Sequence, residues 1–319
     1  MKLVVVIVNF RTADLTMQVV RAVLGEIFDM AARVMVVDND SQDGSFEQLS
    51  KAVVAEGLSA RVTVVLSDRN GGFGHGINVA VRRCLELPDA PSYFYVLNPD
   101  AFPDPGAVRR LVDCLDENPD VGIAGSHIRS TDGRDEIGGF RFPSVLSELE
   151  TTMRLGPMTR LLRRWVVPLP SPEQARDVDW VSGVSMMIRK EVFETVGLFD
   201  EGFFLYFEEI DFCRRVRQGR FRATYVAESK IRHIGSVSTG MGDVHRPMPA
   251  YWFASRRRYF QKHHGRAYVA ACDVLFTIGF SLWRVRRKIQ GKPDTDKPHM
   301  LRDFIRYNFP RWLAREEPR

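Results

Sequence analysis

The feature that most constrains the fold of this chain is a regular alternation of short apolar runs with longer amphipathic segments. The apolar runs predict buried strands at residues 2–8, 33–37, 62–66, 93–97 and 121–125. The segments between them predict helices at residues 15–28, 45–56 and 76–87, and from Asp104-Pro105 onward. Strands separated by helices form right-handed βαβ units in one mostly parallel sheet. The first 125 residues are therefore predicted to be an α/β unit with helices on the faces of its sheet.

The remainder of the chain is less regular. Residues 127–178 show little hydrophobic periodicity, whereas residues 180–188 and 222–226 predict strands. A helix is expected at residues 208–218, because Gly219 then provides a C-terminal stop. Beyond Pro249 the chain is predicted to be helical and basic.

Charge divides the chain at about the same place. Residues 251–319 hold 16 Lys and Arg against 6 Asp and Glu, a net charge of +10, and the preceding 250 residues hold 29 against 34, a net charge of −5. A basic tail indicates an anionic membrane or nucleic acid as partner, and no nucleic-acid-binding module is recognisable. We expect a domain at residues 1–245, with halves of about 1–125 and 126–245, and a helical extension at 246–319.

The apolar segment at residues 267–283 of this tail is too short for a comfortable membrane span and contains Asp273. Between arginine-rich flanks, its larger side chains form one helical stripe of Val269, Phe276, Phe280 and Trp283. Such a stripe either anchors a helix in the membrane interface or packs on the preceding domain. The sequence leaves both interpretations open.

Cysteine usage and the first residues indicate the compartment. The four cysteines are far apart and form no CxxC pair, which argues against a zinc site and a disulfide framework and fits a reducing cytosol. The apolar run at residues 3–8 is too short for a signal peptide, and Asn9 and Arg11 follow where a cleavage site would lie. We therefore expect a cytoplasmic protein.

Polar residues follow two of the predicted strands. Asn98-Pro99-Asp100 follows the strand at 93–97, and Asp38-Asn39-Asp40-Ser41 follows the strand at 33–37. In open α/β sheets, ligands bind beyond the carboxyl ends of the strands. A carboxylate placed there can hold a divalent cation against phosphate oxygens, or accept hydrogen bonds from a base or ribose. The alternative at Asp100 is a turn whose Asp bonds its own backbone, and the alternative at the Asp38 cluster is an ordinary βα turn with a Ser cap.

A glycine-rich stretch precedes the third predicted helix and reads Asp68-Arg69-Asn70-Gly71-Gly72-Phe73-Gly74-His75-Gly76-Ile77-Asn78. Glycines before a helix allow the backbone to approach an anion closely. The stretch lacks the third glycine of the dinucleotide fingerprint and the Lys-Ser/Thr of the P-loop, which argues against a dehydrogenase and a P-loop hydrolase. It favours a diphosphate contact over a plain flexible turn.

Three carboxylates, Glu208, Glu209 and Asp211, open the predicted helix at 208–218 after an aromatic run. The helix dipole alone favours acidic residues in a first turn. Glu208 and Asp211 share one helical face and Glu209 points away from it, so one carboxylate can face a substrate while another anchors the helix to a following arginine. A later histidine, His233, is either structural or meets a metal.

These clusters, in this order, resemble glycosyltransferase family 2 with the GT-A fold, and within it a bacterial rhamnosyltransferase-like branch. The resemblance covers about residues 3–240. The matching segments are Val5–Phe10, Val36–Ser41, Asn70–Asn78, Leu97–Asp100, Asp179–Gly183, Gly197–Glu201, Phe204–Arg214 and His233 with Ser236. Each segment alone is a weak signal, whereas the ordered set is specific.

The resemblance also implies roles for individual residues. Nucleotide and diphosphate would be bound by Asn9, Arg11, Asp38, Asp40, Asp68, Asn70, Gly71, Gly74, Asn78, Asn98 and Asp100. Mg²⁺ or Mn²⁺ would be held by Asp100 and His233. The sugar and acceptor pocket would be shaped by Trp180, Ser182 and Gly183. Glu209 occupies the place of the catalytic base, and Glu208 and Asp211 belong to the same catalytic segment.

Two positions depart from the family's usual pattern. Asn98 stands where much of the family has the first Asp of its metal motif, and a neutral amide is a poorer ligand than a carboxylate. Glu209 stands where the base is usually Asp, so Glu208 stays an alternative base.

The activity implied by the resemblance is inverting, metal-assisted transfer of a hexose to a hydroxyl of a cell-surface glycan or lipid-linked acceptor, at the inner face of the cell membrane. The best match for the donor is dTDP-rhamnose, which supplies L-rhamnose. UDP-N-acetylglucosamine and UDP-galactofuranose are alternative donors. A rival from another class is a non-catalytic protein that binds a nucleotide sugar, and the presence together of Asp100, the acidic segment and His233 argues against it.

Overall fold

The computed structural model describes residues 1–136, 138–170, 174–235 and 243–312 of the chain. The chain divides into two compact units. Unit 1 comprises Met1–Phe140, Leu169–Phe204 and Glu208–Thr239, and unit 2 comprises Arg141–Pro168, Leu205–Phe207 and Gly240–Arg319. The expected domain boundary near residue 245 stays a proposal.

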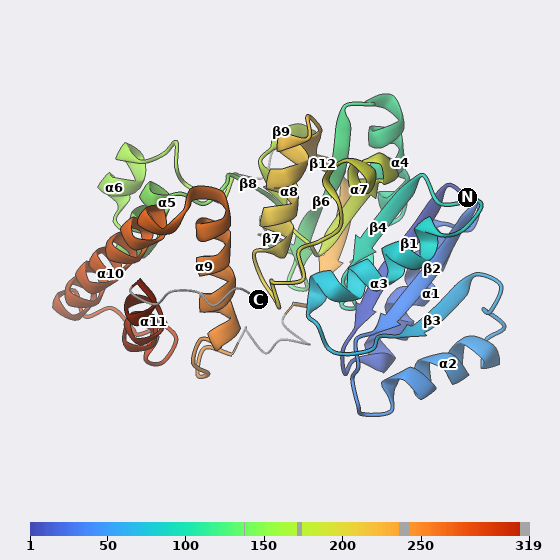
Figure 1. Cartoon of the computed structure of the whole chain (residues 1–319), viewed down its shortest axis with the longest axis horizontal. Coiled ribbons are helices and arrows are strands. Elements are labelled where there is room, and N and C mark those ends of the chain that lie inside the picture. The colour runs from blue at the N-terminus through green and yellow to red at the C-terminus, as the bar shows by residue number, and fades with distance from the viewer. Residues whose placement is uncertain (137, 171–173, 236–242, 313–319) are drawn as a thin grey trace. The chain divides into compact units, whose positions relative to one another are not determined.

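Unit 1 is built on a mostly parallel sheet (Figure 1). Its principal strands are β1 (Leu3–Asn9), β2 (Ala32–Asp38), β3 (Val62–Leu66), β4 (Tyr93–Leu97), β5 (Ala101–Pro103), β6 (Val121–Ser130), β11 (Ser185–Arg189) and β12 (Arg222–His233). They lie in the order β3-β2-β1-β4-β11-β6-β12-β5. The neighbours among β1 to β4 pair in parallel, as do β6 and β12, whereas β11 is antiparallel to both β4 and β6.

Four short strands complete unit 1. β7 (Asp135–Glu136) pairs with β6, and β9 (Arg176–Val178) pairs with β12. A separate two-stranded sheet forms from β8 (Gly139–Phe140) and β10 (Trp180–Val181).

Helices cover both faces of the main sheet. Alternate residues of β1 pack with α1 (Ala13–Glu26), α2 (Ser45–Ala55) and α4 (Ala107–Glu117) in one large core. The other face is covered by α3 (Phe73–Leu85), α7 (Lys190–Val196) and α8 (Glu208–Gln218). A Cβ on Gly76 of α3 would lie 2.6 Å from a methyl carbon of Val8, so this glycine lets α3 lie close to the sheet. Strands buried on both faces explain their continuous apolar runs.

The predicted parallel α/β architecture is confirmed, with differences at element ends. α3 begins at Phe73 rather than Gly76. The helix expected to open with Asp104 as its cap begins at Ala107, because Gly106 takes the left-handed conformation (φ 82°) at the N-cap. The Asp104 carboxylate pairs with Arg129 instead.

Two further predictions were too coarse. The run at 180–188 is two strands, β10 and β11, separated by a turn at residues 182–184. The irregular region at 127–178 contains two helices, α5 (Val145–Met153) and α6 (Gly156–Leu161), which belong to unit 2. Both helices are short, which explains why their periodicity is weak.

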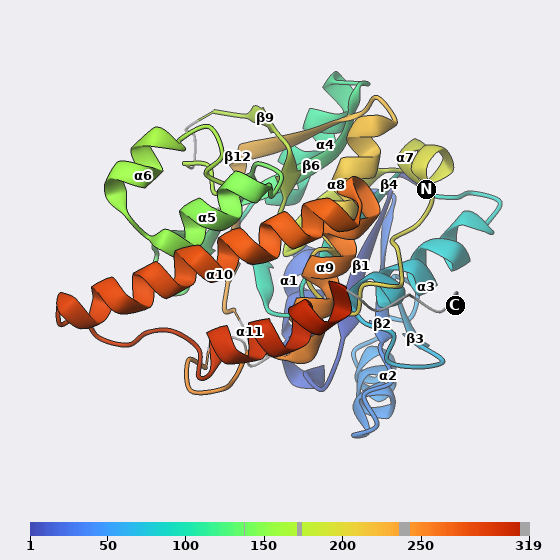
Figure 2. The same cartoon turned by 60° about the vertical axis from the view of Figure 1, so that its left-hand side comes forward.

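Besides α5 and α6, unit 2 contains α9 (Ala250–His264), α10 (Arg266–Ile289), α11 (Met300–Asn308) and a 3₁₀ turn, η1 (Phe309–Trp312) (Figure 2). Its apolar core contains Phe253, Phe276, Phe280, Trp283, Met300 and Phe304. A fully buried arginine, Arg256, lies beside this core and bonds Glu148 at 2.7 Å and Asp273 at 2.6 Å. Two carboxylates around one guanidinium satisfy a charge that would otherwise be costly to bury.

The aromatic stripe of the C-terminal segment lies inside unit 2. Val269, Phe276, Phe280 and Trp283 are each less than a tenth exposed. Of the two interpretations that the sequence left open, the one in which this stripe faces lipid is therefore wrong, because its aromatic side chains pack on neighbouring helices of unit 2. By length and composition, α10 is the one helix among the described residues that qualifies to cross a membrane, although 39% of its most apolar window is buried. Core helices meet the same criteria.

Candidate active site

The first part of the site lies at the carboxyl ends of β1 and β2. The Asp38 carboxylate is buried and accepts hydrogen bonds from the Asn9 side-chain amide at 2.6 Å and from the Ser41 hydroxyl at 2.7 Å. Thr16 donates to the amide oxygen of Asn9 at 2.8 Å and fixes its orientation. Parallel pairing places Asn9 opposite Asp38 in register, which brings these two predicted donor-binding residues together.

Backbone strain marks the loops that follow these strands. Arg11, Asp40 and Gln42 have φ between 54° and 57°, in the left-handed region that non-glycine residues rarely occupy. Arg11 bonds Ser41 through its backbone N–H at 3.0 Å and its Nε at 3.1 Å, so the two loops hold each other. Such strain is found mainly at sites where surrounding contacts enforce a functional geometry.

The second part of the site is the turn at Asn98-Pro99-Asp100, which follows β4. The backbone N–H of Ala101 donates to the Asn98 carbonyl at 3.2 Å and closes the turn. β5 then pairs with β12 and sets Ala101 opposite His233. The His233 Nε2 lies 3.4 Å from an oxygen of Asp100, a carboxylate that is only 4% exposed. Residues 100 and 233, far apart in the sequence, are thus brought together as predicted.

The donor set at this turn fits a cation shared with a substrate. Among the described residues, no group of three or more His, Cys, Asp or Glu gathers to hold a metal. Asp100 and His233 supply two ligand groups at one point. Mg²⁺ and Mn²⁺ sites in phosphate-binding enzymes use one or two carboxylates and complete their shell with substrate phosphates and water. These residues therefore suit a cation that is bound together with a diphosphate.

The third part is the glycine-rich loop. Asn39 extends from the β2 loop and donates to Asn70 at 3.0 Å and to the Gly72 carbonyl at 3.1 Å. The Phe73 N–H, at the start of α3, donates to the carbonyl of Phe204 at 3.1 Å. Hydrogen bonds therefore hold the glycine-rich loop to the Asp38 loop on one side and to Phe204 on the other. Phe204 is the last residue of the segment Leu169–Phe204 of unit 1.

Gly72 is expected to be the least replaceable residue of this loop. Its φ is 91°, and a Cβ would lie 1.8 Å from the Phe204 carbonyl oxygen. We expect Gly72→Ala to lower stability by about 3 kcal/mol or more, since it adds a backbone clash to the roughly 1–3 kcal/mol of strain in that φ region. Urea denaturation gives the difference.

A matched control isolates the clash from the strain. Gly197 has φ 76° and ψ −172°, near the φ 91° and ψ −178° of Gly72, and a Cβ there would meet nothing within 4 Å. Gly197→Ala is expected to show the strain alone. Equal losses in the two variants would contradict a close approach of Phe204 to the loop.

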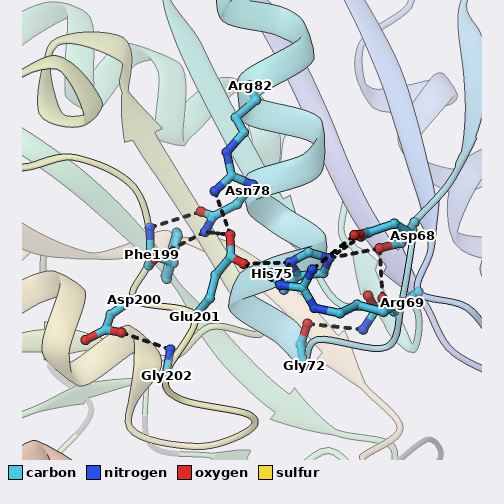
Figure 3. Close-up of polar contacts among 12 residues, drawn as sticks. Asp68, Arg69, Gly72, His75, Asn78, Arg82, Phe199, Asp200, Glu201 and Gly202 are labelled. Carbon is cyan, nitrogen blue, oxygen red and sulfur yellow. Dashed lines mark hydrogen bonds and ion pairs between the residues drawn. The ribbon is translucent and has the colours of Figure 1, made fainter. Parts of the chain in front are cut away.

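A polar network holds the loop and α3 to the segment that precedes α8 (Figure 3). His75 is buried, with Nδ1 2.8 Å from Glu201 and Nε2 3.1 Å from Asp68. Glu201 also accepts from Asn78 at 2.9 Å and Arg82 at 2.6 Å. Burial by itself raises the pKa of Glu201, but the hydrogen bonds from Asn78, His75 and Arg82 outweigh it and lower the pKa to about 2.

This network uses several residues that were expected to bind the donor. The Asn78 amide is fully buried and bonds both the carbonyl and the N–H of Phe199. Asn70 accepts from Asn39 and from the Gly72 N–H within the loop itself. Gly71 has no room for a side chain, because a Cβ would lie 2.5 Å from the His75 ring. Their contacts shape the loop, and donor binding by these residues stays a proposal.

The fourth part is the start of α8. Glu208 is buried, and Glu209 is half-buried. Each has a buried Oε2 with no hydrogen-bond partner among the described residues. A Cβ built on Gly74 would lie 3.8 Å from the Glu208 Cβ, and one on Gly183 would lie 3.9 Å from the Glu209 Cβ. Glu208 therefore faces the start of α3, whereas Glu209 faces the turn before β11.

Burial controls the charge of both carboxyls. Desolvation raises the pKa of Glu209 to about 7, against weaker hydrogen bonds from nearby backbone N–H groups. Desolvation also raises the pKa of Glu208 well above its usual value, and the neighbouring Glu209 charge adds to the effect. A carboxyl that titrates near neutral pH and has an unpartnered oxygen can take a proton from a bound hydroxyl group.

The third carboxylate of this segment has a different environment. Asp211 is fully buried and pairs with Arg215 at 2.9 Å, which confirms an anchor to a following arginine. Arg215 in turn bonds the carbonyls of Val196 and Leu198 at 2.7 and 2.8 Å. Asp211 thus holds α8 to the segment after α7, and a catalytic part for it stays only a proposal.

The predicted sugar and acceptor residues surround Glu209. Gly183 lies against Phe73 and Glu209, and the carbonyl of Val184 accepts from the Asn98 N–H at 2.9 Å. Ser182 accepts from the Val184 N–H at 3.3 Å. The turn at 182–184 therefore connects the Asn98–Asp100 turn to Glu209. The Trp180 ring is buried and stacks on Phe140 with centroids 3.9 Å apart, so one of its faces is already covered.

Contacts thus connect the four parts of the site in one continuous path within unit 1. Sequence reasoning did not identify Glu201 and His75 as the residues that join α3 to the acidic segment. Glu201 lies in a matching segment, but its partners are more than a hundred residues away in the sequence. Ser236, the last residue of the expected motifs, lies outside the described residues.

Comparison with known families identifies one match over most of the chain. A family model described as "Glycosyltransferase like family 2" matches residues 2–265. The chain is 27% identical over 251 residues to an N-acetylglucosaminyl-diphospho-decaprenol L-rhamnosyltransferase of Mycobacterium tuberculosis, covering 75% of this chain and 74% of that protein.

Two solved structures are similar over nearly the whole chain. A crystal structure of GalNAc-T7 with UDP, GalNAc and Mn²⁺ matches with a TM-score of 0.62 at 14% identity over 97% of this chain, which spans 57% of that longer chain. The mannosyltransferase PcManGT from Pyrobaculum calidifontis, in complex with GDP-Man and Mn²⁺, matches with a TM-score of 0.56 at 14% identity over 99% of this chain and 88% of that one. At this identity the likeness shows the fold, which is the predicted GT-A fold.

Proposed function

The chain belongs to glycosyltransferase family 2 and is an enzyme of the glycosyltransferase class, and from this we propose that it transfers a sugar from a nucleotide-diphosphate donor to an acceptor hydroxyl with inversion at the anomeric carbon. Glu209 acts as the general base in this proposal. The observation that carries it is the Glu209 carboxyl, with a buried unpartnered oxygen and a pKa raised to about 7 beside the Gly183 turn.

Glu209 removes the proton of the acceptor hydroxyl as its oxygen attacks the anomeric carbon. A new C–O bond forms, the bond to the diphosphate breaks with its electron pair, and the proton passes to Glu209. A base must lie within about 2.6–3.2 Å of the hydroxyl it deprotonates and is most effective with a pKa near the working pH. Direct displacement requires no covalent enzyme intermediate, so a separate nucleophile is not needed.

The Asp100 turn and the loops at β1 and β2 hold the donor in this proposal. Asp100 and His233 hold a divalent cation, which when bound supplies charge neutralisation to the departing diphosphate. Asp38 and Asn9 orient the base or ribose, and the backbone of the glycine-rich loop with Arg11 approaches the diphosphate. Asp40 and Asp68 remain donor contacts in the proposal; Asp40 is half-buried and the Asp68 side chain is exposed.

L-Rhamnose supplied by dTDP-rhamnose is our first choice of donor sugar. The supporting observation is the printed activity of the mycobacterial relative, an L-rhamnosyltransferase, which matches this chain over three quarters of its length. That relative is also named for a lipid-linked acceptor, N-acetylglucosaminyl-diphospho-decaprenol, and we infer a lipid-linked acceptor here. UDP-N-acetylglucosamine and UDP-galactofuranose are the alternative donors.

We infer that the enzyme works on the cytoplasmic side of the cell membrane, where nucleotide sugars meet lipid-linked acceptors. All four of its cysteines are free thiols, and three of them are buried. Burial raises the pKa of Cys84 to about 11 and that of Cys213 to about 12, so these thiols stay protonated and unreactive at neutral pH. Free thiols are the rule in a reducing compartment.

The donor is tested by thermal shift with Mn²⁺ across a panel of nucleotide sugars. We expect dTDP-rhamnose to raise the Tm by several degrees more than either UDP-sugar at the same concentration, because a ligand that binds only the folded state stabilises it by mass action. dTDP alone separates recognition of the nucleotide from that of the sugar. A larger shift with UDP-N-acetylglucosamine would overturn rhamnose while leaving the class of reaction intact.

A further inference from the structure

The outer face of α10 in unit 2 carries a continuous apolar stripe. It consists of Ala267, Ala271, Val274, Ile278, Leu282, Val285 and Ile289, all of them exposed. On a helical wheel of about 100° per residue, all seven lie within about 40° of Ile278. The stripe extends for about 33 Å at about 1.5 Å per residue, and it contains no charged or polar side chain.

This stripe is distinct from the aromatic stripe that packs in the core. The buried side of α10 carries Phe276, Phe280 and Trp283, whereas exposure on the outer side reaches 59% at Val285 and 80% at Ile289. Soluble surfaces rarely leave so many large aliphatic side chains exposed in one contiguous row. We propose that this face of α10 lies on an anionic lipid bilayer, with the helix axis in the plane of the membrane interface.

Positive charge at the borders of the stripe favours an anionic lipid bilayer as its partner. Lys288 and Arg286 flank the stripe on its two sides near the C-terminal end, and exposed Arg266 precedes it. In helices that lie in the membrane interface, the apolar face inserts among the acyl chains and the basic residues beside it contact anionic headgroups. A second copy of the chain is a poorer occupant, because antiparallel pairing of two stripes would bring Arg266 close to Lys288 of the other copy.

A second exposed segment of unit 2 also combines apolar and basic side chains. Leu161 at the end of α6 is 72% exposed, and Trp165 just after it is 39% exposed. Exposed Arg163 and Arg164 lie between them and form no ion pair among the described residues. Tryptophan and arginine are favoured where apolar acyl chains meet the headgroups. This segment therefore adds a second contact of the same chemistry.

The buried side of α10 argues against a helix that crosses the membrane. Asp273 is fully buried, bonds Arg256 at 2.6 Å and accepts from the Trp312 indole N–H at 3.0 Å. A crossing helix would have to leave these partners and carry a carboxylate into the hydrocarbon region. An in-plane helix keeps the buried side intact and offers only its outer stripe to lipid.

Vesicle sedimentation tests the inference directly. The wild-type protein should sediment with vesicles of equal parts phosphatidylcholine and phosphatidylglycerol at low salt. The triple variant Ile278→Glu/Leu282→Glu/Val285→Glu should lower the partition coefficient at least about tenfold, because it places three carboxylates where acyl chains and anionic headgroups would lie. Transfer to a short water-soluble acceptor should be unchanged in the variant.

A control variant places two substitutions of the same kind on the other unit. Phe28 is 76% exposed and Val54 is 70% exposed, both in unit 1, so Phe28→Glu/Val54→Glu alters exposed apolar residues that do not belong to unit 2. This control should sediment like the wild type. Unchanged vesicle binding by the triple variant, or no binding by the wild type, would overturn the inference. A wild-type dimer in light scattering that the triple variant converts to monomer would assign the stripe to a second copy instead.

The inference does not depend on which sugar is transferred. Loss of vesicle binding with normal transfer to the water-soluble acceptor would support the membrane face alone. Absence of transfer in the wild type, with normal vesicle binding, would instead count against the proposed function. The two claims therefore fail separately.

Discussion

Replacing Glu209 with glutamine is expected to lower turnover by about 10²–10⁴-fold while leaving donor affinity within about twofold of the wild type. Glutamine keeps the size of the side chain and its place beside Gly183, but it cannot accept the proton of the acceptor hydroxyl. Turnover is measured by release of the nucleoside diphosphate in the presence of acceptor, and donor affinity by calorimetry with Mn²⁺.

The pH dependence of the wild type belongs to the same prediction. With the pKa of Glu209 raised to about 7, the base is protonated below that pH and ionised above it. The value of kcat/KM should therefore rise tenfold per pH unit below about 7 and level off above it. In the Glu209→Gln variant this step should be absent from the residual rate.

Stability gives an independent check on the burial of this carboxyl. A raised pKa means that the folded protein holds its proton more tightly than the unfolded chain does. The wild type should then lose stability as pH rises from about 4.5 through about 7, and the variant should be the more stable protein above that range. A variant that is less stable at pH 8 would show that Glu209 is not held in a desolvated site.

Glu208→Gln is the matched comparison, because Glu208 is the neighbouring buried carboxyl with an unpartnered oxygen. It faces Gly74 at the start of α3, and we expect a smaller loss of turnover than for Glu209→Gln. Full activity in the Glu209 variant would transfer the role of base to Glu208 or Asp211. The ion pair between Asp211 and Arg215 makes Asp211 the less suitable of the two.

The second large effect is expected at Asp100. Asp100→Asn removes a charge at the turn where His233 approaches, with almost no change in shape. We expect donor affinity measured with Mn²⁺ to fall about 100-fold or more, because the amide is a much weaker ligand for a hard cation. Added Mn²⁺ should tighten donor binding by the wild type and have little effect on the variant.

Asp89→Asn is the control for loss of one negative charge. The Asp89 side chain is 70% exposed and lies 3.9 Å from the amino terminus, at the opposite end of β1 from the site. Its variant should bind the donor like the wild type. If Asp100→Asn kept its Mn²⁺-dependent gain in donor affinity, the cation would have to be held elsewhere.

The sequence predicts this fold well because its strands are buried on both faces. Short continuous apolar runs such as those of β1 and β4 are typical of strands buried on both faces of a parallel sheet. The polar residues that follow these runs therefore lie beyond the carboxyl ends of the strands. The exact start of a helix is decided more locally. At α4, the left-handed Gly106 overrides the favourable Asp-Pro start.

Contacts made across long sequence separations could not be predicted in the same way. His75 and Glu201 are in contact only because α3 and the segment before α8 pack together. The sequence around either residue does not indicate which residue it will contact. The orientation of α10 was equally hidden, since both of its sides are apolar and periodicity alone does not say which one the core covers. Burial of Asp273 with Arg256 settles that choice.

The central claim is that the Asp100 turn holds the donor while Glu209 performs the proton transfer, and a parallel calorimetric and kinetic comparison of the two variants tests it most directly. With Mn²⁺ present, Glu209→Gln should bind dTDP-rhamnose like the wild type without turning it over, whereas Asp100→Asn should lose the binding itself. Equal loss of donor binding in both variants, or normal turnover by Glu209→Gln, would contradict this division of roles.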